Sequence, residues 1–207
     1  SAVGSAVKLS ATYNFFDGAE FLVRSVELIR PHVDHISIIN QTTSNYGHPQ
    51  SAASAAALHE VLRRGLIDEL ETYVPDLDLL GAQNEFSKRH RGIELARAAG
   101  MDHFLFVDAD EFYEADPFEA AKSMIDSHGW WSTTVPVWNY YGQPTWRLRE
   151  PAGFVPFICR VSTEHEMLAP HPMLVDPTRR VRVPESHTYL FGLTEISMHH
   201  FTGVRWD

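Results

Sequence analysis

Two aspartates one residue apart are placed to bind a divalent cation. Asp108 and Asp110 follow the apolar run 104–107. Side chains two residues apart on an extended chain point the same way, so the two carboxylates converge while Ala109 turns aside. Hard carboxylate oxygens suit Mg²⁺ or Mn²⁺, which keep coordination positions open for phosphate. Alternatively, Asp108 caps a turn and Asp110 belongs to a solvated acidic loop.

The position of this pair favours the metal site. An apolar run bounded by turn signals is typical of a buried central strand in a parallel sheet. In open α/β sheets, ligands bind at the carboxyl ends of such strands. The sequence therefore predicts a metal and phosphate site directly after residue 107.

The elements that position this site alternate along about the first 110 residues. We expect strands at 9–16, 35–40, 67–74 and 103–107, separated by helices at 19–30, 51–64 and 84–99. Strand–helix alternation of this kind predicts an α/β fold with a mostly parallel, doubly wound sheet.

The second half has a different pattern, with one short helix at about 116–127. Further strands are expected at 130–141, 154–161, 180–184 and 194–201. They predict an antiparallel C-terminal extension that closes over the carboxyl edge of the first half. With 207 residues, the chain fits a single domain, 1–207, divided at about residue 116.

Composition and charge exclude several classes of protein. No apolar run approaches the ~18 residues of a membrane span, and no signal peptide begins the chain. The single cysteine, Cys159, favours a reducing compartment. A net charge of −10 argues against nucleic-acid binding. We therefore expect a cytoplasmic protein with no transmembrane segment, and peripheral attachment to a membrane remains open.

Four segments, in order, resemble the motifs of family 2 glycosyltransferases with a GT-A fold. Leu9–Asn14 is similar to the first-strand signature, and 88–92 to an arginine- and glycine-containing helix motif. Phe106–Glu111 resembles the metal motif, and Met198–Phe201 the late histidine that completes the metal shell.

The resemblance implies a metal-dependent transfer of a sugar from a nucleotide-diphosphate sugar to an acceptor hydroxyl, with inversion. A UDP- or GDP-sugar would bind to about 1–116, and a saccharide or lipid-linked acceptor to about 117–207. The cofactor would be Mn²⁺ or Mg²⁺. A haloacid-dehalogenase-like phosphohydrolase and a non-catalytic nucleotide-sugar-binding module are the alternatives.

The resemblance also implies roles for individual residues. Asp108 and Asp110 would hold the metal with His200 or His199. Neighbouring residues on a strand face opposite ways, so one histidine should reach the metal, and His200 is preferred because Phe201 follows it. The residues expected to contact the donor are Tyr13, Asn14, Asn40 or Gln41, Lys88, Arg89 and Asp108. Alternatively, Lys88, Arg89 and Arg91 form an ordinary solvated helix face.

The catalytic base should be a carboxylate near the acceptor hydroxyl, because that hydroxyl loses its proton during transfer. Glu185 is the first candidate, since Pro184 stiffens its loop. Asp176 and then Glu164 follow.

Overall fold

The computed structural model describes residues 7–162, 176–179 and 187–204. The expected strand at 180–184 and the candidate bases Glu164 and Glu185 lie outside these ranges.

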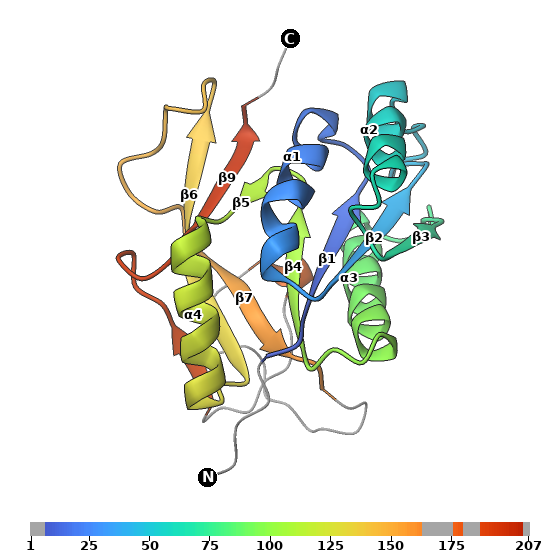
Figure 1. The fold of residues 1–207 in the computed structure, drawn as a ribbon. Helices are drawn as coiled ribbons and strands as arrows, with labels where there is room; N and C mark the ends of the chain where they lie inside the picture. The colour runs from blue at the N-terminus through green and yellow to red at the C-terminus, as the bar shows by residue number, and fades with distance from the viewer. Residues whose placement is uncertain (1–6, 163–175, 180–186, 205–207) are drawn as a thin grey trace.

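Four parallel strands form the first half of the sheet (Figure 1). They are β1 (Leu9–Phe15), β2 (His35–Gln41), β3 (Glu69–Tyr73) and β4 (His103–Asp108), in the spatial order β3-β2-β1-β4. The register pairs Asn14 with Asp108, so the ends of β1 and β4 lie side by side. The predicted doubly wound parallel sheet is confirmed.

Helices cover both faces of this sheet (Figure 1). The helices of this half are α1 (Ala19–Ile29), α2 (Ala52–Arg63) and α3 (Gly81–Ala98), with a short 3-10 turn, η1 (Arg30–His32). Leu105 and Val107 on β4 share one core with α1 and α2, whereas Phe104 and Phe106 pack in a second cluster with Ala96 of α3. Because successive side chains of a strand alternate, neighbouring residues point to opposite faces of the sheet.

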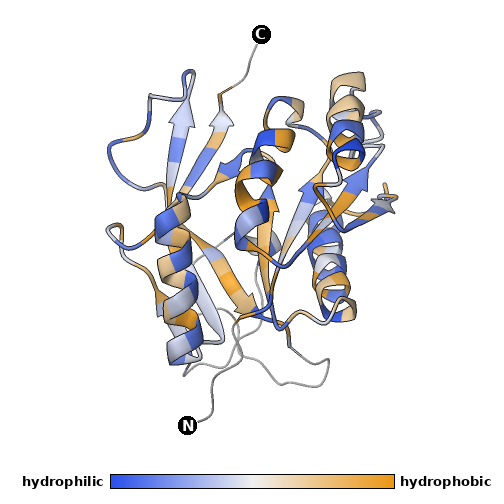
Figure 2. Cartoon of the chain, in the orientation of Figure 1, coloured by the Kyte–Doolittle hydropathy of each residue, from blue (hydrophilic) through white to orange (hydrophobic). Residues whose placement is uncertain are grey.

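The second half continues the same sheet. It contains α4 (Ala115–His128), β5 (Glu111–Phe112), β6 (Ser132–Tyr141), β7 (Phe154–Arg160), η2 (Pro177–Arg179), β8 (Thr188–Leu190) and β9 (Met198–Gly203). The order continues β4-β7-β6-β9-β5, with β8 beside β6. Figure 2 shows apolar residues concentrated in β4 and β7, near the centre of the molecule.

The strands of this extension pair in both directions, whereas the sequence predicted an antiparallel extension. β7 runs antiparallel to both β4 and β6, as does β5 to β9, but β6 is parallel to both β8 and β9. The two short strands β5 and β8 were not expected, because two or three residues are too few to show a periodic pattern. β9 begins at Met198, four residues after the predicted start.

Helix α3 approaches β1 closely at Gly92. A Cβ atom on Gly92 would lie 2.9 Å from both Cβ and Oγ1 of Thr12. Gly81, at the start of the same helix, has no neighbour closer than 3.6 Å to such an atom. The glycine in this helix motif therefore sets the distance between α3 and the sheet.

We expect Gly92→Ala to lower the free energy of unfolding by about 1–3 kcal/mol, because overpacking forces α3 away from β1. Gly81→Ala is the matched control, which should be neutral or stabilising by up to about 1 kcal/mol. Denaturant titration of both variants measures the difference. Equal stabilities would contradict the close approach.

Candidate functional site

A polar cleft of about 170 Å³ lies at the carboxyl ends of β1 and β4. Its walls come from the end of β1 with the following loop, from α3, and from the turn after β4. The lining residues are Asn14, Phe16, Asp17, Gly18, Glu85, Lys88, Asp108, Ala109 and Asp110. The structure thus brings together Asn14, Lys88 and both aspartates of the predicted site.

Asp108 is held by two arginines. Nη2 of Arg89 lies 3.0 Å from both carboxylate oxygens, and Nη2 of Arg179 donates to Oδ2 at 2.6 Å. Burial alone would raise the pKa of Asp108, but the charges of Arg89 and Arg179 outweigh it and hold the pKa well below its usual range. Asp108 is therefore an ionised carboxylate with a fixed orientation.

Glu111 and Arg179 complete this buried ion cluster, which consists of Arg89, Asp108, Glu111 and Arg179. Arg179 donates to both carboxylate oxygens of Glu111, through Nη1 to Oε2 at 3.0 Å and through Nη2 to Oε1. Oε2 of Glu111 also accepts from the backbone amide of Asp108 at 3.0 Å. Burial raises the pKa of Glu111; Arg179 opposes that shift and the negative charge of Asp108 adds to it.

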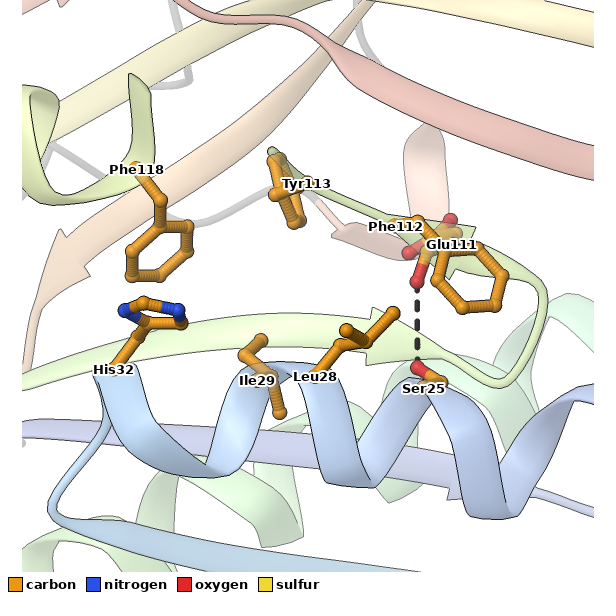
Figure 3. A pocket seen from close by; sticks show the side chains of 8 residues that line it. All are labelled: Ser25, Leu28, Ile29, His32, Glu111, Phe112, Tyr113 and Phe118. Atoms are coloured by element: carbon orange, nitrogen blue, oxygen red, sulfur yellow. Dashed lines mark hydrogen bonds between the residues drawn. The ribbon is translucent and has the colours of Figure 1, made fainter. Parts of the chain in front are cut away.

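Glu111 and Arg179 belong to the site, but neither was assigned a role from the sequence. Glu111 could have been suspected because it directly follows the aspartate pair, but Arg179 is 68 residues away along the chain from Glu111. The backbone of Glu111 is fixed from the opposite side, where Ser25 of α1 donates to its carbonyl oxygen at 3.3 Å. Figure 3 shows this contact at the edge of a small cavity between α1 and β5.

His200 and His199 point to different partners. Nε2 of His200 lies 3.6 Å from Oδ1 of Asp110, while its Nδ1 is 3.2 Å from Oδ1 of Asn139. Nε2 of His199 lies instead 3.4 Å from Oε1 of Glu114, and its Nδ1 is 2.7 Å from the hydroxyl of Tyr140. The structure thus brings His200, and not His199, to the aspartate pair.

The residues around Asp110 fit a divalent cation that is shared with a substrate. Among residues 7–162, 176–179 and 187–204, no three His, Cys, Asp or Glu side chains converge as a complete metal cage. Mg²⁺-like ions commonly use one or two carboxylates and take their remaining ligands from water and substrate phosphates. Asp110 and His200 could supply a carboxylate and an imidazole, whereas Asp108 is already bound by Arg89 and Arg179.

A hydrogen-bonded network centred on Glu85 forms the α3 wall of the cleft. Its carboxylate accepts from Asn14 at 3.1 Å, from Asn45 at 3.2 Å and from Lys88 at 2.6 Å. Lys88 also donates to Oε1 of Gln41. Burial lowers the pKa of Lys88, and Glu85 opposes the shift. Glu85 was not predicted, and it links three of the predicted donor residues.

Two predicted donor residues lie on the wrong face of the sheet for this cleft. Tyr13 is fully buried, and its hydroxyl lies 2.9 Å from Oγ of Ser25 on α1. Asn40 is buried and accepts from Gln50. The pleat sends these side chains to the α1 face, and their neighbours Asn14 and Gln41 to the α3 face. Of the two alternatives at the end of β2, Gln41 lies on the α3 face and contacts Lys88, but it is buried and does not line the cleft.

Two further predicted residues, Arg89 and Asp176, are not among the residues that line the cleft. Arg89 is neither on a solvated face nor open to the cleft, because its side chain is 5% exposed and lies behind Asp108. Asp176 is exposed, accepts from Thr178, and has Oδ2 3.9 Å from Nε of Arg179. Asp176 therefore lies next to Arg179, which in turn contacts Asp108.

Comparisons with known proteins extend the description of the fold. No protein-family model and no curated protein matches this chain. The structure of S. aureus TarS matches over 95% of this chain with a TM-score of 0.57 and 10% identity. Residues 1–349 of TarS match over 94% with a TM-score of 0.53 and 9% identity. GalNAc-T7 with UDP, GalNAc and Mn²⁺ covers 65% of this chain, with a TM-score of 0.47 and 14% identity.

These solved structures are of glycosyltransferases. The fold is GT-A-like. The chain spans 37% of the full TarS chain, 60% of its 1–349 segment and 24% of GalNAc-T7. Within the part of the chain that the structure describes, no helix is both long and apolar enough to cross a membrane.

We expect Arg179→Met to lower the free energy of unfolding by about 3–5 kcal/mol, because it leaves the buried carboxylate of Glu111 without its cation, while Asp108 keeps only Arg89. Adding Glu111→Met in the same chain should restore part of this loss, which a double-mutant cycle would measure. Arg24→Met, at a side chain that is 67% exposed, is the control and should change stability little. Strict additivity of the two substitutions would contradict the pairing of Arg179 with Glu111.

Proposed function

We propose that this chain is a metal-dependent glycosyltransferase that moves a sugar from a nucleotide-diphosphate sugar to an acceptor hydroxyl, with inversion. One observation carries the proposal. Asp110 faces a polar cleft at the carboxyl end of the central strand β4, and β9 brings His200 to within 3.6 Å of it. The GT-A-like fold supports the same reaction class.

The donor would lie in the polar cleft. Asn14 and Lys88, both bound to Glu85, offer a hydrogen bond for a base or ribose and a cation for phosphate. Gln41 accepts from Lys88 and would position it from behind. A UDP-sugar is the donor we propose first, because TarS has also been crystallised with UDP and with UDP-GlcNAc. A GDP-sugar is the second choice.

Asp110 and His200 would hold Mn²⁺ or Mg²⁺. When bound, such a cation neutralises the negative charge that develops on the departing diphosphate. Asp108, fixed by Arg89 and Arg179, accepts hydrogen bonds from the sugar or ribose hydroxyls. It orients the donor for attack.

The transfer is a single displacement. The acceptor oxygen forms a bond to the anomeric carbon, the bond from that carbon to the diphosphate oxygen breaks, and the nucleoside diphosphate leaves. The hydroxyl proton passes to a carboxylate base. Glu185 remains our first candidate for this base, and Asp176, beside Arg179, is the second.

The alternatives are less well supported. In a haloacid-dehalogenase-like enzyme, the aspartate pair would follow the first strand of the core, but here it follows β4. A non-catalytic module would bind a nucleotide sugar and leave it intact. We propose a protein of the cytoplasm or of a membrane surface, acting on a saccharide or lipid-linked acceptor.

Turnover of nucleotide sugars tests the proposal. Incubation with UDP- and GDP-sugars and Mn²⁺ should release the nucleoside diphosphate slowly to water and faster with a suitable acceptor. Anion-exchange chromatography would detect the release. Binding without release identifies the non-catalytic module, and hydrolysis of an aryl phosphate identifies the phosphohydrolase.

We predict that Asp110→Asn weakens Mn²⁺-dependent binding of UDP by more than about tenfold, because an uncharged amide oxygen binds a hard cation more weakly than a carboxylate does. Calorimetric titration at fixed Mn²⁺ gives the dissociation constant. Asp126→Asn on the exposed side of α4 is the control and should bind as the wild type does. Unchanged, metal-dependent affinity in Asp110→Asn would remove this carboxylate from the metal site.

A second substitution pair compares the adjacent histidines. His200→Ala should weaken Mn²⁺-dependent UDP binding more than His199→Ala, because Nε2 of His200 faces Asp110 whereas Nε2 of His199 faces Glu114. The same titration distinguishes them. Equal effects, or a larger effect for His199→Ala, would contradict the assignment of His200 as the distant ligand.

A further inference from the structure

A second pocket, distinct in chemistry from the polar cleft, lies between α1, β5 and β9. Its volume is about 330 Å³, at the lower end of the range for small-molecule sites. Side chains of Phe21, Phe112, Phe201 and Val204 form its apolar wall. Glu114 and His199 lie at the same pocket, with Oε1 and Nε2 3.4 Å apart. We call it the aromatic pocket.

The wall of the aromatic pocket is a cluster of rings from three elements. The ring of Phe112 meets Phe21 edge-on with centroids 6.1 Å apart, and meets Phe201 edge-on at 5.4 Å. Tyr140 stacks on Phe201 with the ring centroids 4.4 Å apart. Phe21 comes from α1, Phe112 from β5 and Phe201 from β9. Figure 1 shows β5 between α1 and β9. The rings therefore support one another and form a preformed surface.

This pocket adjoins the proposed catalytic site through the backbone. The amide of Phe201 donates to the carbonyl oxygen of Asp110 at 2.9 Å, and Phe112 follows Asp110 by two residues. On the α1 side, Phe21 follows Gly18, which lines the polar cleft. The two sites thus draw their walls from the same two chain segments, the turn after β4 and the start of α1.

The polar cleft and the aromatic pocket suit ligands of different chemistry. A nucleoside diphosphate is strongly negative and fits the polar cleft, whereas a wall of phenylalanine rings is stabilised chiefly when apolar surface covers it. The second substrate of a transferase must also come close to Asp110. The His199–Glu114 pair offers hydrogen bonds to a hydroxyl at the same pocket.

We propose that the aromatic pocket binds the acceptor, and that this acceptor carries an apolar group next to the hydroxyl that receives the sugar. The assignment to the acceptor rests on the proposed glycosyltransferase function. The apolar group covers Phe112 and Phe201, and the hydroxyl points toward Asp110. An aromatic ring and a short alkyl chain share this chemistry.

The test compares three ligands that differ only in the group on one oxygen: phenyl, hexyl and methyl β-D-glucopyranoside. Calorimetric titration of the folded chain with UDP and Mn²⁺ present should give dissociation constants for the phenyl or hexyl compound at least about tenfold lower than for the methyl compound. If the phenyl compound binds more tightly than the hexyl compound, the pocket prefers an aromatic ring. The reverse order indicates an alkyl chain. Equal affinities, or no binding by any of the three, would overturn the proposal.

Single substitutions test whether the glucosides bind in the aromatic pocket. Phe112→Ser should abolish the advantage of the apolar compounds, whereas Phe86→Ser, at a half-exposed ring on α3, should retain it. Pro144→Trp narrows the pocket from an exposed loop without removing core contacts, so it tests the proposal if Phe112→Ser fails to fold. An advantage that persists in Pro144→Trp or in folded Phe112→Ser would contradict the site.

A separate titration with UDP and Mn²⁺, without any glucoside, reports on the proposed function alone. If UDP binds and the glucosides do not discriminate, only the acceptor proposal fails. If UDP does not bind at all, the transferase proposal fails. In that case, binding of a glucoside in the aromatic pocket would not identify the pocket as an acceptor site.

Discussion

The buried ion cluster of Arg89, Asp108, Glu111 and Arg179 is the interaction on which the site depends. Two arginines and two carboxylates come from α3, η2, the end of β4 and β5, so one group of contacts fixes four separate segments. Removing charges from water is costly unless each is paired, and the balance of two cations and two anions meets that requirement. The cluster leaves Asp108 ionised and rigid and holds Asp110 at the cleft, where His200 can approach it.

The alternation of the pleat then decides which neighbours share the cleft. On β1, Asn14 faces α3 and Tyr13 faces α1. On β2, Gln41 faces Lys88 and Asn40 points to the other face. On β9, His200 faces Asp110 and His199 faces Glu114. The GT-A-like fold thus produces two chemically distinct surfaces from consecutive residues: a polar cleft at β1 and β4, and the aromatic pocket at β5 and β9.

The parallel half of the fold could be predicted from the sequence, because its apolar runs and glycine-ended helices are long enough to show their periods. The aspartate pair was found for the same reason, since it follows the clearest of those runs. β5 and β8 are too short to carry a period, and Arg179 reaches Glu111 only through the tertiary fold. Sequence alone also cannot say which face of a strand meets which helix, so Tyr13 could not be separated from Asn14.

The most direct test of the account is a titration of Mn²⁺ into the wild-type chain, followed by the electron paramagnetic resonance signal of free Mn²⁺, with and without UDP. Two protein ligands hold such an ion weakly and a diphosphate completes its shell. We therefore predict that UDP lowers the dissociation constant of the protein for Mn²⁺ by more than about tenfold, after correction for the Mn²⁺ that UDP binds in a protein-free titration. An affinity for Mn²⁺ that is the same with and without UDP would contradict a shared metal and diphosphate site at Asp110.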